Sequence, residues 1–98
     1  MPPKHDIDET IHQKTRLWIR AHLAVVGEAD FLALKRLLNL SDGNLSVHTS
    51  ILEKKGYIEM EKSFVGKKTH TMYRITPAGR KAFQDYIGEL EDILKGVL

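Results

Sequence analysis

The residues best suited to chemistry lie in one segment, SDGNLSVHTSILEKKGY, near the middle of the chain. If Leu45 and Leu52 face a protein core, the helical repeat turns a row of short side chains outward, with Ser46 at its edge. Amide and hydroxyl groups there can hydrogen-bond to base edges in a DNA major groove about 12 Å wide, and a valine can contact a thymine methyl. An ordinary solvated face would carry Glu or Lys instead. We therefore expect DNA readout by Gly43, Asn44, Ser46, Val47 and Ser50.

A second candidate group lies between two segments of alternating pattern. YIEMEKSF places Ile58, Met60 and Phe64 on one side, and TMYRIT alternates in the same way. This period of two predicts strands, and Gly66 in the intervening VGKKTH gives the chain freedom to turn. The tip of the predicted hairpin is basic, which suits a DNA backbone or the negative potential of a minor groove. The expected contacts are Lys67, Lys68, Thr69 and His70, and a merely solubilising loop is the alternative.

Charge is unevenly distributed along the chain. Residues 44–74 carry six basic and three acidic side chains, whereas the segments 1–30 and 75–98 are slightly acidic. A basic patch between acidic ends favours a polyanionic partner. Glu59 and Glu61 would repel DNA, so we expect their strand face to point away from it. Further phosphate contacts are expected at Lys35, Arg36, Lys54, Lys55 and Arg74.

Helices flank the hairpin in the predicted architecture. Apolar spacing predicts helices over about 7–26, 30–39 and 42–55, then a hairpin over about 57–76 and a helix over about 77–97. The expected N-caps are Asp6 or Asp8, Asp30, Ser41 and Thr76. The second and third helices, joined by a brief turn, form a helix-turn-helix. The sequence thus predicts one domain over residues 1–98, mainly α with a β-hairpin (α+β).

This order resembles the small winged helix-turn-helix transcriptional regulators of bacteria and archaea, of the MarR and ArsR kind. The likeness covers residues 30–80 most strongly. It implies a homodimer that binds double-stranded DNA with the third helix in the major groove and the hairpin as a wing. Similar sequences usually have Leu where this chain has Thr49, so Thr49 packs inward or turns toward the DNA. The likeness rests on Ser41, Gly43, Asn44, Leu45, Ser46, His48, Leu52, Glu53, Gly56, Tyr57, Thr76, Gly79 and Arg80.

Composition excludes several classes of protein. With 98 residues, 42% of them apolar and 29% charged, the chain is expected to be globular. It has no Cys, no apolar run near the roughly 20 residues of a membrane span and no secretory signal, so a cytoplasmic location is expected. It has neither a phosphate loop nor a nucleophile elbow, so no enzyme and no cofactor are expected. His12 with Asp8 is the best metal candidate, and a solvated pair is favoured over a metal site.

Apolar stripes on the first and last helices predict a self-association surface. Ile7, Ile11, Trp18 and Val25 recur at heptad-like spacing, and a small domain has difficulty burying this stripe together with that of the last helix. Two alternatives stay open. The first is a winged-helix protein–protein interaction module without DNA binding. The second is a pocket for an unknown effector at the dimer interface, between Trp18, Phe83 and Tyr86, which would add to the DNA role. The expected dimer residues are Ile11, Trp18, Phe83, Ile87, Leu90, Leu94 and Val97.

Overall fold

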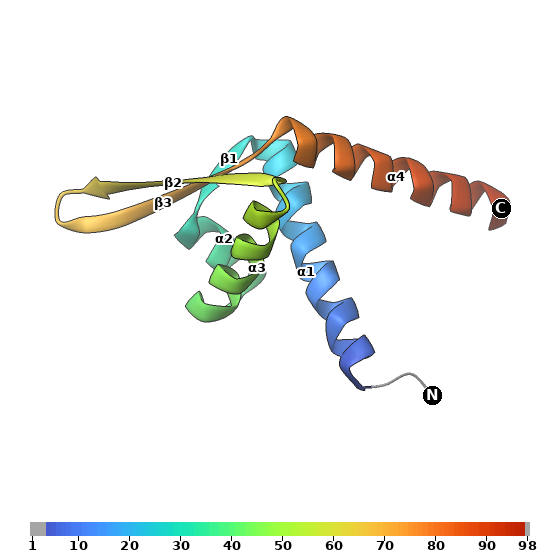
Figure 1. Ribbon diagram of the computed structural model, residues 1–98, viewed down its shortest axis with the longest axis horizontal. Coiled ribbons are helices and arrows are strands. Elements are labelled where there is room, and N and C mark those ends of the chain that lie inside the picture. Colours follow the sequence, from blue (N-terminus) through green and yellow to red (C-terminus); the bar gives the residue numbers. More distant parts are fainter. Residues whose placement is uncertain (1–3, 98) are drawn as a thin grey trace.

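The structure, a computed structural model, describes the backbone of residues 4–97 and the side chains of residues 13–96 (Figure 1). The predicted α+β architecture of helices around a hairpin is confirmed, and a short strand joins it. In chain order the elements are α1 (Lys4–Val26), β1 (Glu28–Asp30), α2 (Phe31–Leu38), α3 (Asp42–Lys54), β2 (Ile58–Val65), β3 (Lys68–Ile75) and α4 (Pro77–Val97).

Local capping sets where the helices begin and end. The side chain of Asp30 accepts a hydrogen bond from the Ala33 amide at 2.7 Å, and that of Ser41 accepts one from the Asn44 amide at 3.1 Å. These bonds satisfy amides that have no partner within the first turn of a helix. Asn39 ends α2 in the left-handed region, with φ 52°. The predicted caps of α2, α3 and α4 are confirmed, since Thr76 likewise accepts a hydrogen bond from the Gly79 amide at 2.9 Å. The predicted cap of the first helix at Asp6 or Asp8 is wrong, because α1 begins at Lys4 and both residues lie within the helix.

Strand β1 is the element that the sequence analysis missed. It pairs antiparallel with β3, which also pairs with β2, so the sheet order is β1-β3-β2. With three residues, β1 is too short to show a period of two. It forms because Ala29, buried at 8% exposure, lies opposite Tyr73 and covers the core.

The core lies where α1, α2, α3 and the base of the hairpin meet. Ile19, Leu23, Leu34 and Leu45 have no exposed surface, and Leu52 and Ile58 have almost none. On α1 this leaves the described residues of the predicted self-association stripe exposed. The heptad residues Trp18 and Val25 are 57% and 85% exposed, because the i, i+4 pair Ile19 and Leu23 occupies the inward face instead.

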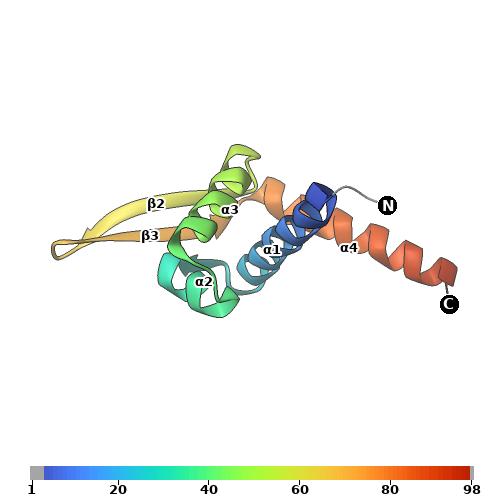
Figure 2. The same cartoon turned by 90° about the horizontal axis from the view of Figure 1, so that it is seen from below.

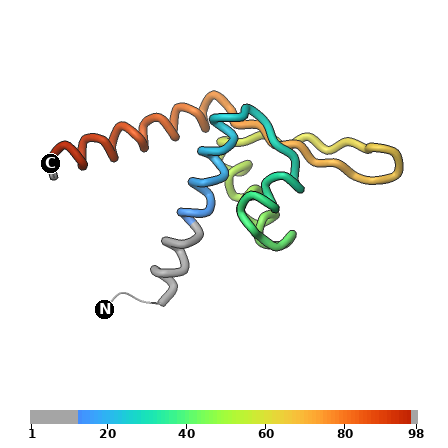
Figure 3. Tube along the Cα trace, turned by 180° about the vertical axis from the view of Figure 1, so that it is seen from behind, coloured from blue at the N-terminus to red at the C-terminus, as the bar shows by residue number. Residues whose placement is uncertain are grey.

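Two arms leave this centre in opposite directions. The hairpin extends to one side and α4 to the other, as Figures 1 and 3 both show, and the molecule measures 54 × 31 × 22 Å. The arms share one junction. Thr76 donates from its amide to the Tyr57 carbonyl at 3.0 Å and from its hydroxyl to the Gly56 carbonyl at 2.6 Å. A side chain on Gly79 would collide with the backbone of Tyr57, so the two arm bases are in close contact.

Candidate nucleic-acid interface

The face of α3 opposite the core carries the predicted readout residues. Gly43, Asn44, Ser46, Val47 and Ser50 are all exposed, with Val47 at 58%. The buried residues of the same helix are Leu45, His48, Thr49 and Leu52. The helix therefore has a row of short, uncharged side chains on its exposed face.

Thr49 packs inward. It is 3% exposed, and its hydroxyl donates to the Leu45 carbonyl at 2.9 Å. Its Oγ1 also lies 3.5 Å from the hydroxyl of Tyr73, whose pKa is raised by burial. A back-bond to the preceding turn satisfies the polar group that would otherwise be buried without a partner. The threonine thus occupies the inward position and leaves the exposed face of α3 unchanged.

The inner face of α3 is also fixed by a polar contact from α1. His48 and Arg16 are 6% and 8% exposed, and Nδ1 of His48 lies 3.5 Å from a guanidinium nitrogen of Arg16. The donor and acceptor roles in this contact depend on the tautomer of the His48 ring. Local spacing could not predict the contact, because 32 residues separate the two side chains.

The wing covers the predicted hairpin, but its second strand is longer and its loop is shorter than predicted. Val65 pairs with Lys68, which leaves a loop of Gly66 and Lys67 in place of the expected six-residue connection. Gly66 has φ 65°, as the first central residue of a type II′ turn requires. Lys67 and Lys68 are exposed at the tip, and Thr69 is exposed beside them.

His70 lies on β3, away from the tip, and is partly buried. Its Nε2 is 3.4 Å from Oδ2 of Asp30, the residue that caps α2. The hydrogen bond from the Ala33 amide is the main cause that lowers the pKa of Asp30, and His70 adds to it. Placing His70 here corrects its prediction as a tip residue. The contact instead links the wing to the helix-turn-helix.

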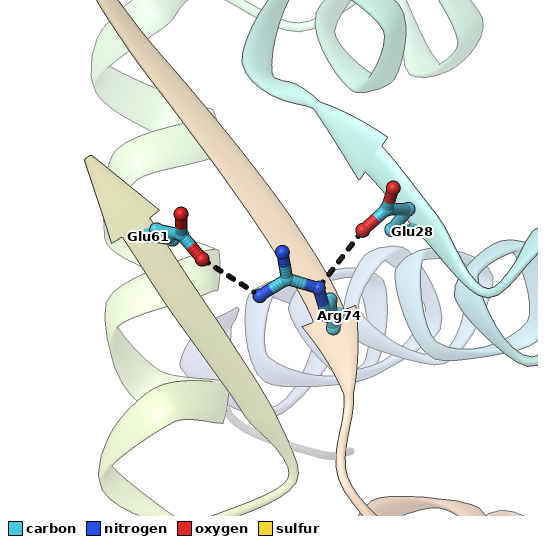
Figure 4. Close-up of polar contacts among 3 residues, drawn as sticks. All are labelled: Glu28, Glu61 and Arg74. Atoms are coloured by element: carbon cyan, nitrogen blue, oxygen red, sulfur yellow. Dashed lines mark hydrogen bonds and ion pairs between the residues drawn. The ribbon is translucent and has the colours of Figure 1, made fainter. Parts of the chain in front are cut away.

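Arg74 is held in a network on the outer face of the sheet (Figure 4). Its Nε donates to Glu28 at 2.8 Å and another guanidinium nitrogen donates to Glu61 at 3.0 Å. Both hydrogen bonds raise the pKa of Arg74, the one to Glu61 more strongly. This engagement argues against the predicted phosphate contact, because two carboxylates surround the cation and would repel a phosphate.

The other candidate phosphate contacts differ in their availability. Lys35 forms an ion pair with Asp42 at 2.7 Å, which connects α2 to the first turn of α3. Arg36, Lys54 and Lys55 are exposed on the ends of α2 and α3. Exposed lysines and arginines of this kind can neutralise phosphates without sequence preference.

The candidate dimer residues lie mostly on α4, beyond its contact with α1. Ile87, Leu90 and Leu94 are 36%, 40% and 49% exposed, as an unpartnered apolar stripe would be. Phe83 instead packs within its own chain, with its ring centroid 6.0 Å from the Arg20 guanidinium carbon. The side chains of Ile11 and Val97 lie outside the described residues.

Trp18 and Tyr86 border separate hollows within one chain. Trp18 lines a groove of about 630 Å³ between α1 and α2, together with His22 and Leu37. Tyr86 lines another of about 550 Å³, beside Leu17. One chain alone does not bring Trp18 and Tyr86 to the same hollow, and the effector pocket at a dimer interface stays a prediction.

Two further kinds of site do not occur in the described part of the chain. None of its helices combines the length and apolar character needed to cross a bilayer. Within residues 13–96, no three His, Asp or Glu side chains gather in a way that could hold a metal ion. The candidate pair Asp8 and His12 lies outside that range.

This chain is similar to known winged-helix proteins in sequence and in fold. Residues 15–94 match the family described as the winged helix DNA-binding domain. An uncharacterised protein of Methanocaldococcus jannaschii is 39% identical over 82 residues, which cover 84% of this chain and 89% of that protein. A transcriptional regulator homologue from Pyrococcus horikoshii is 27% identical with a TM-score of 0.77, over 84% of this chain and 81% of that one. PadR of Bacillus subtilis in complex with operator DNA shares the fold, with 17% identity and a TM-score of 0.65 over 74% of this chain and 46% of that one.

Proposed function

Because this chain belongs to the family of winged helix DNA-binding domains, we propose that it is a transcriptional regulator that binds double-stranded DNA as a homodimer and represses by blocking polymerase. One observation carries the proposal. The exposed face of α3 has short polar side chains, and a basic wing projects from the same body beside it (Figure 2). A helix for the groove next to a cationic arm for the backbone is what duplex recognition needs.

The proposed contacts divide into readout and positioning. Asn44 reads adenine through paired hydrogen bonds, Ser46 and Ser50 bond to base edges or phosphates, and Val47 contacts a thymine methyl. Gly43 lets the backbone approach closely. Phosphate contacts come from Lys67, Lys68 and Thr69 on the wing and from Lys35, Arg36, Lys54 and Lys55 around the helix-turn-helix, all within one domain.

Dimerisation is proposed through the exposed apolar side chains of α4 and of α1. Leu90, Ile93 and Leu94 are 40%, 63% and 49% exposed on an arm that leaves the body, and Trp18 adds a large exposed ring. Burial of these groups against a second copy is favourable. A two-fold axis there would separate the two α3 helices by about 34 Å, so the proposed operator is an inverted repeat with half-sites one turn apart.

The subfamily proposed is PadR-like. The sequence resemblance to MarR and ArsR regulators concerns the helix-turn-helix and wing, which these groups have in common. Support for PadR comes from the solved structure of Bacillus subtilis PadR, which shares this fold.

The decisive experiment is a fluorescence anisotropy titration of a labelled random duplex at several salt concentrations. Binding in the micromolar range, with affinity that falls steeply as salt rises, is the expected result because phosphate contacts release counterions. Selection from a random library would then identify the operator. Absence of binding at low salt would contradict the proposal and favour a protein–protein interaction module.

A further inference from the structure

Phe64, near the tip of the wing, is 75% exposed. At the base of the hairpin, Ile58 and Tyr73 are 2% and 3% exposed because α3 covers them. Farther out, the described side chains of β2 are exposed, and Phe64 ends the apolar side that begins with Ile58. A single exposed apolar residue is ordinary on a protein surface. What distinguishes Phe64 is therefore its position on the wing.

Strand register places Phe64 on the side of the wing that faces α3. Alternate residues share a face, so Phe64 lies on the same side as Lys62, with Thr69 and Thr71 as their partners on β3. Lys62 and Thr71 also line a crevice of about 220 Å³ whose other wall includes Ser46 and Ser50 of α3. The wing side that carries Phe64 is thus continuous with the proposed readout face.

The charges around Phe64 point to a polyanion. Residues 62–70 contain Lys62, Lys67 and Lys68 and no Asp or Glu. The acidic residues of the hairpin, Glu59 and Glu61, alternate onto the opposite side, where Glu61 is paired with Arg74. On the hairpin itself, the side that faces α3 therefore presents Lys62 and no carboxylate to a phosphate. Lys67 lies at the tip, and Lys68 lies opposite Val65 on the other side.

We propose that Phe64 enters the DNA minor groove as an apolar wedge and that Lys62 binds the phosphate backbone beside it. Aromatic and aliphatic side chains that enter a minor groove partly unstack a base step and bend the duplex. Cations around the wedge hold it in the groove, where the potential is negative. This inference rests on the proposed function. It adds two residues to the interface and predicts a bent complex.

DNA accounts for this surface better than an acidic protein or a lipid surface. A flat membrane would meet the tip alone, whereas Lys62 and Thr71 line the crevice that leads from the wing to Ser46 and Ser50 on α3. A duplex is a polyanion long enough to contact both the wing and α3.

The test compares Phe64→Ala with Val65→Ala on the full chain. Val65 is 66% exposed and adjacent, but it alternates onto the opposite side, so it is a matched control. Anisotropy titrations of one duplex over several salt concentrations give affinity and salt slope, and energy transfer between dyes at the duplex ends reports bending. Phe64→Ala is expected to weaken binding about tenfold, the order of burying one aromatic ring, with an unchanged salt slope and less bending. Val65→Ala should stay within about twofold of the original chain.

Lys62→Gln supplies the complementary result. Removal of one phosphate contact should lower the steepness of the log–log salt slope by about one and weaken all sequences alike. Thermal unfolding of each variant shows that the fold is retained, since all three side chains are exposed.

Several outcomes would overturn the inference. One is that the unmodified chain binds DNA and Phe64→Ala binds and bends it equally well, in which case the proposed function survives and the wedge does not. Another is that Phe64→Ala lowers the mass on size exclusion, which would place Phe64 in a contact between copies. Failure of the unmodified chain to bind any duplex would instead contradict the proposed function itself.

Discussion

The wing and α4 leave the same junction, yet they expose different kinds of side chain. Residues 58–75 of the wing carry four basic and two acidic residues, with the acidic pair turned away from α3. Residues 77–97 of α4 carry three basic and four acidic residues and an exposed apolar stripe. Of that stripe, Ile93 is 63% exposed and Leu94 is 49% exposed.

This contrast shows how one small fold can separate two kinds of partner. Clustered lysines are expensive to bury against a second copy of themselves, so the wing is suited to phosphates. Removal of an apolar stripe from water is favourable, and such a stripe carries no charge that would bind a phosphate. Helix α4 is therefore suited to pack against the same helix of a second copy. Four variants test this difference between the wing and α4, and they are given in order of decreasing expected effect.

Gly79→Ala should disable both arms together. The new Cβ would collide with the carbonyl oxygen of Tyr57, a backbone atom that cannot move aside, and would lie 2.8 Å from its carbonyl carbon. We expect a loss of about 3 kcal/mol or more in the free energy of unfolding, measured by chemical denaturation. Gly88→Ala is the control, since no atom lies within 4 Å of its Cβ position. Equal stability of the two variants would contradict the close junction.

Lys67→Glu combined with Lys68→Glu should disable the wing alone. Reversal of two tip charges is expected to weaken DNA binding about 100-fold at low salt, measured by anisotropy, and to leave the dimer intact. Lys81→Glu with Lys95→Glu makes the same change of net charge on α4. If the two double variants lose equal affinity, total charge governs binding and the wing has no special role.

Leu90→Arg should disable α4 alone. A charge placed in the proposed dimer contact would be buried without a partner, so the chain is expected to elute as a monomer in size exclusion with light scattering. Gln84→Arg adds the same charge at an exposed polar position of α4 and should leave the dimer unchanged. An intact dimer in Leu90→Arg would remove α4 from the interface.

Asp30→Ala should have the smallest effect and a defined pH dependence. Loss of this N-cap is expected to cost about 1 kcal/mol of stability at pH 7. The pKa of Asp30 in the folded protein lies below its usual value, mainly because the Ala33 amide donates to the carboxylate. Its contribution is therefore present above the usual pKa and is lost as the pH falls through the folded pKa. The difference in unfolding free energy between the original chain and Asp30→Ala should shrink on acidification. For Ser41→Ala, whose cap does not titrate, it should stay constant.

Local sequence was enough to predict what depends on neighbours in the chain. The caps at Asp30, Ser41 and Thr76 involve amides three residues away. The helix stripes and the alternation of the hairpin likewise repeat over a few residues. These patterns set the order of elements and the exposed face of α3, which required only that Leu45 and Leu52 be buried.

Contacts between distant parts of the chain could not be predicted in this way. Arg74 meets Glu28 across 46 residues, and Arg16 meets His48 across 32. Strand β1 exists only because β3 lies beside it. From the charge pattern of the sequence, Arg74 was predicted to contact a phosphate. In the fold it donates instead to the carboxylates of Glu28 and Glu61.

Local sequence pattern and tertiary structure together determine where Lys62 and Phe64 lie. Alternation alone places Lys62 on the apolar side of its strand, where it interrupts the pattern, and that interruption was the signal available in the sequence. Whether an apolar side is buried depends on what covers it, and α3 reaches only the base of the hairpin. The sequence by itself determined which residues share a face, since side-chain period is a local property of the backbone. Tertiary structure decided which of those faces meets the core and which meets a partner, because burial depends on distant elements that local spacing does not specify.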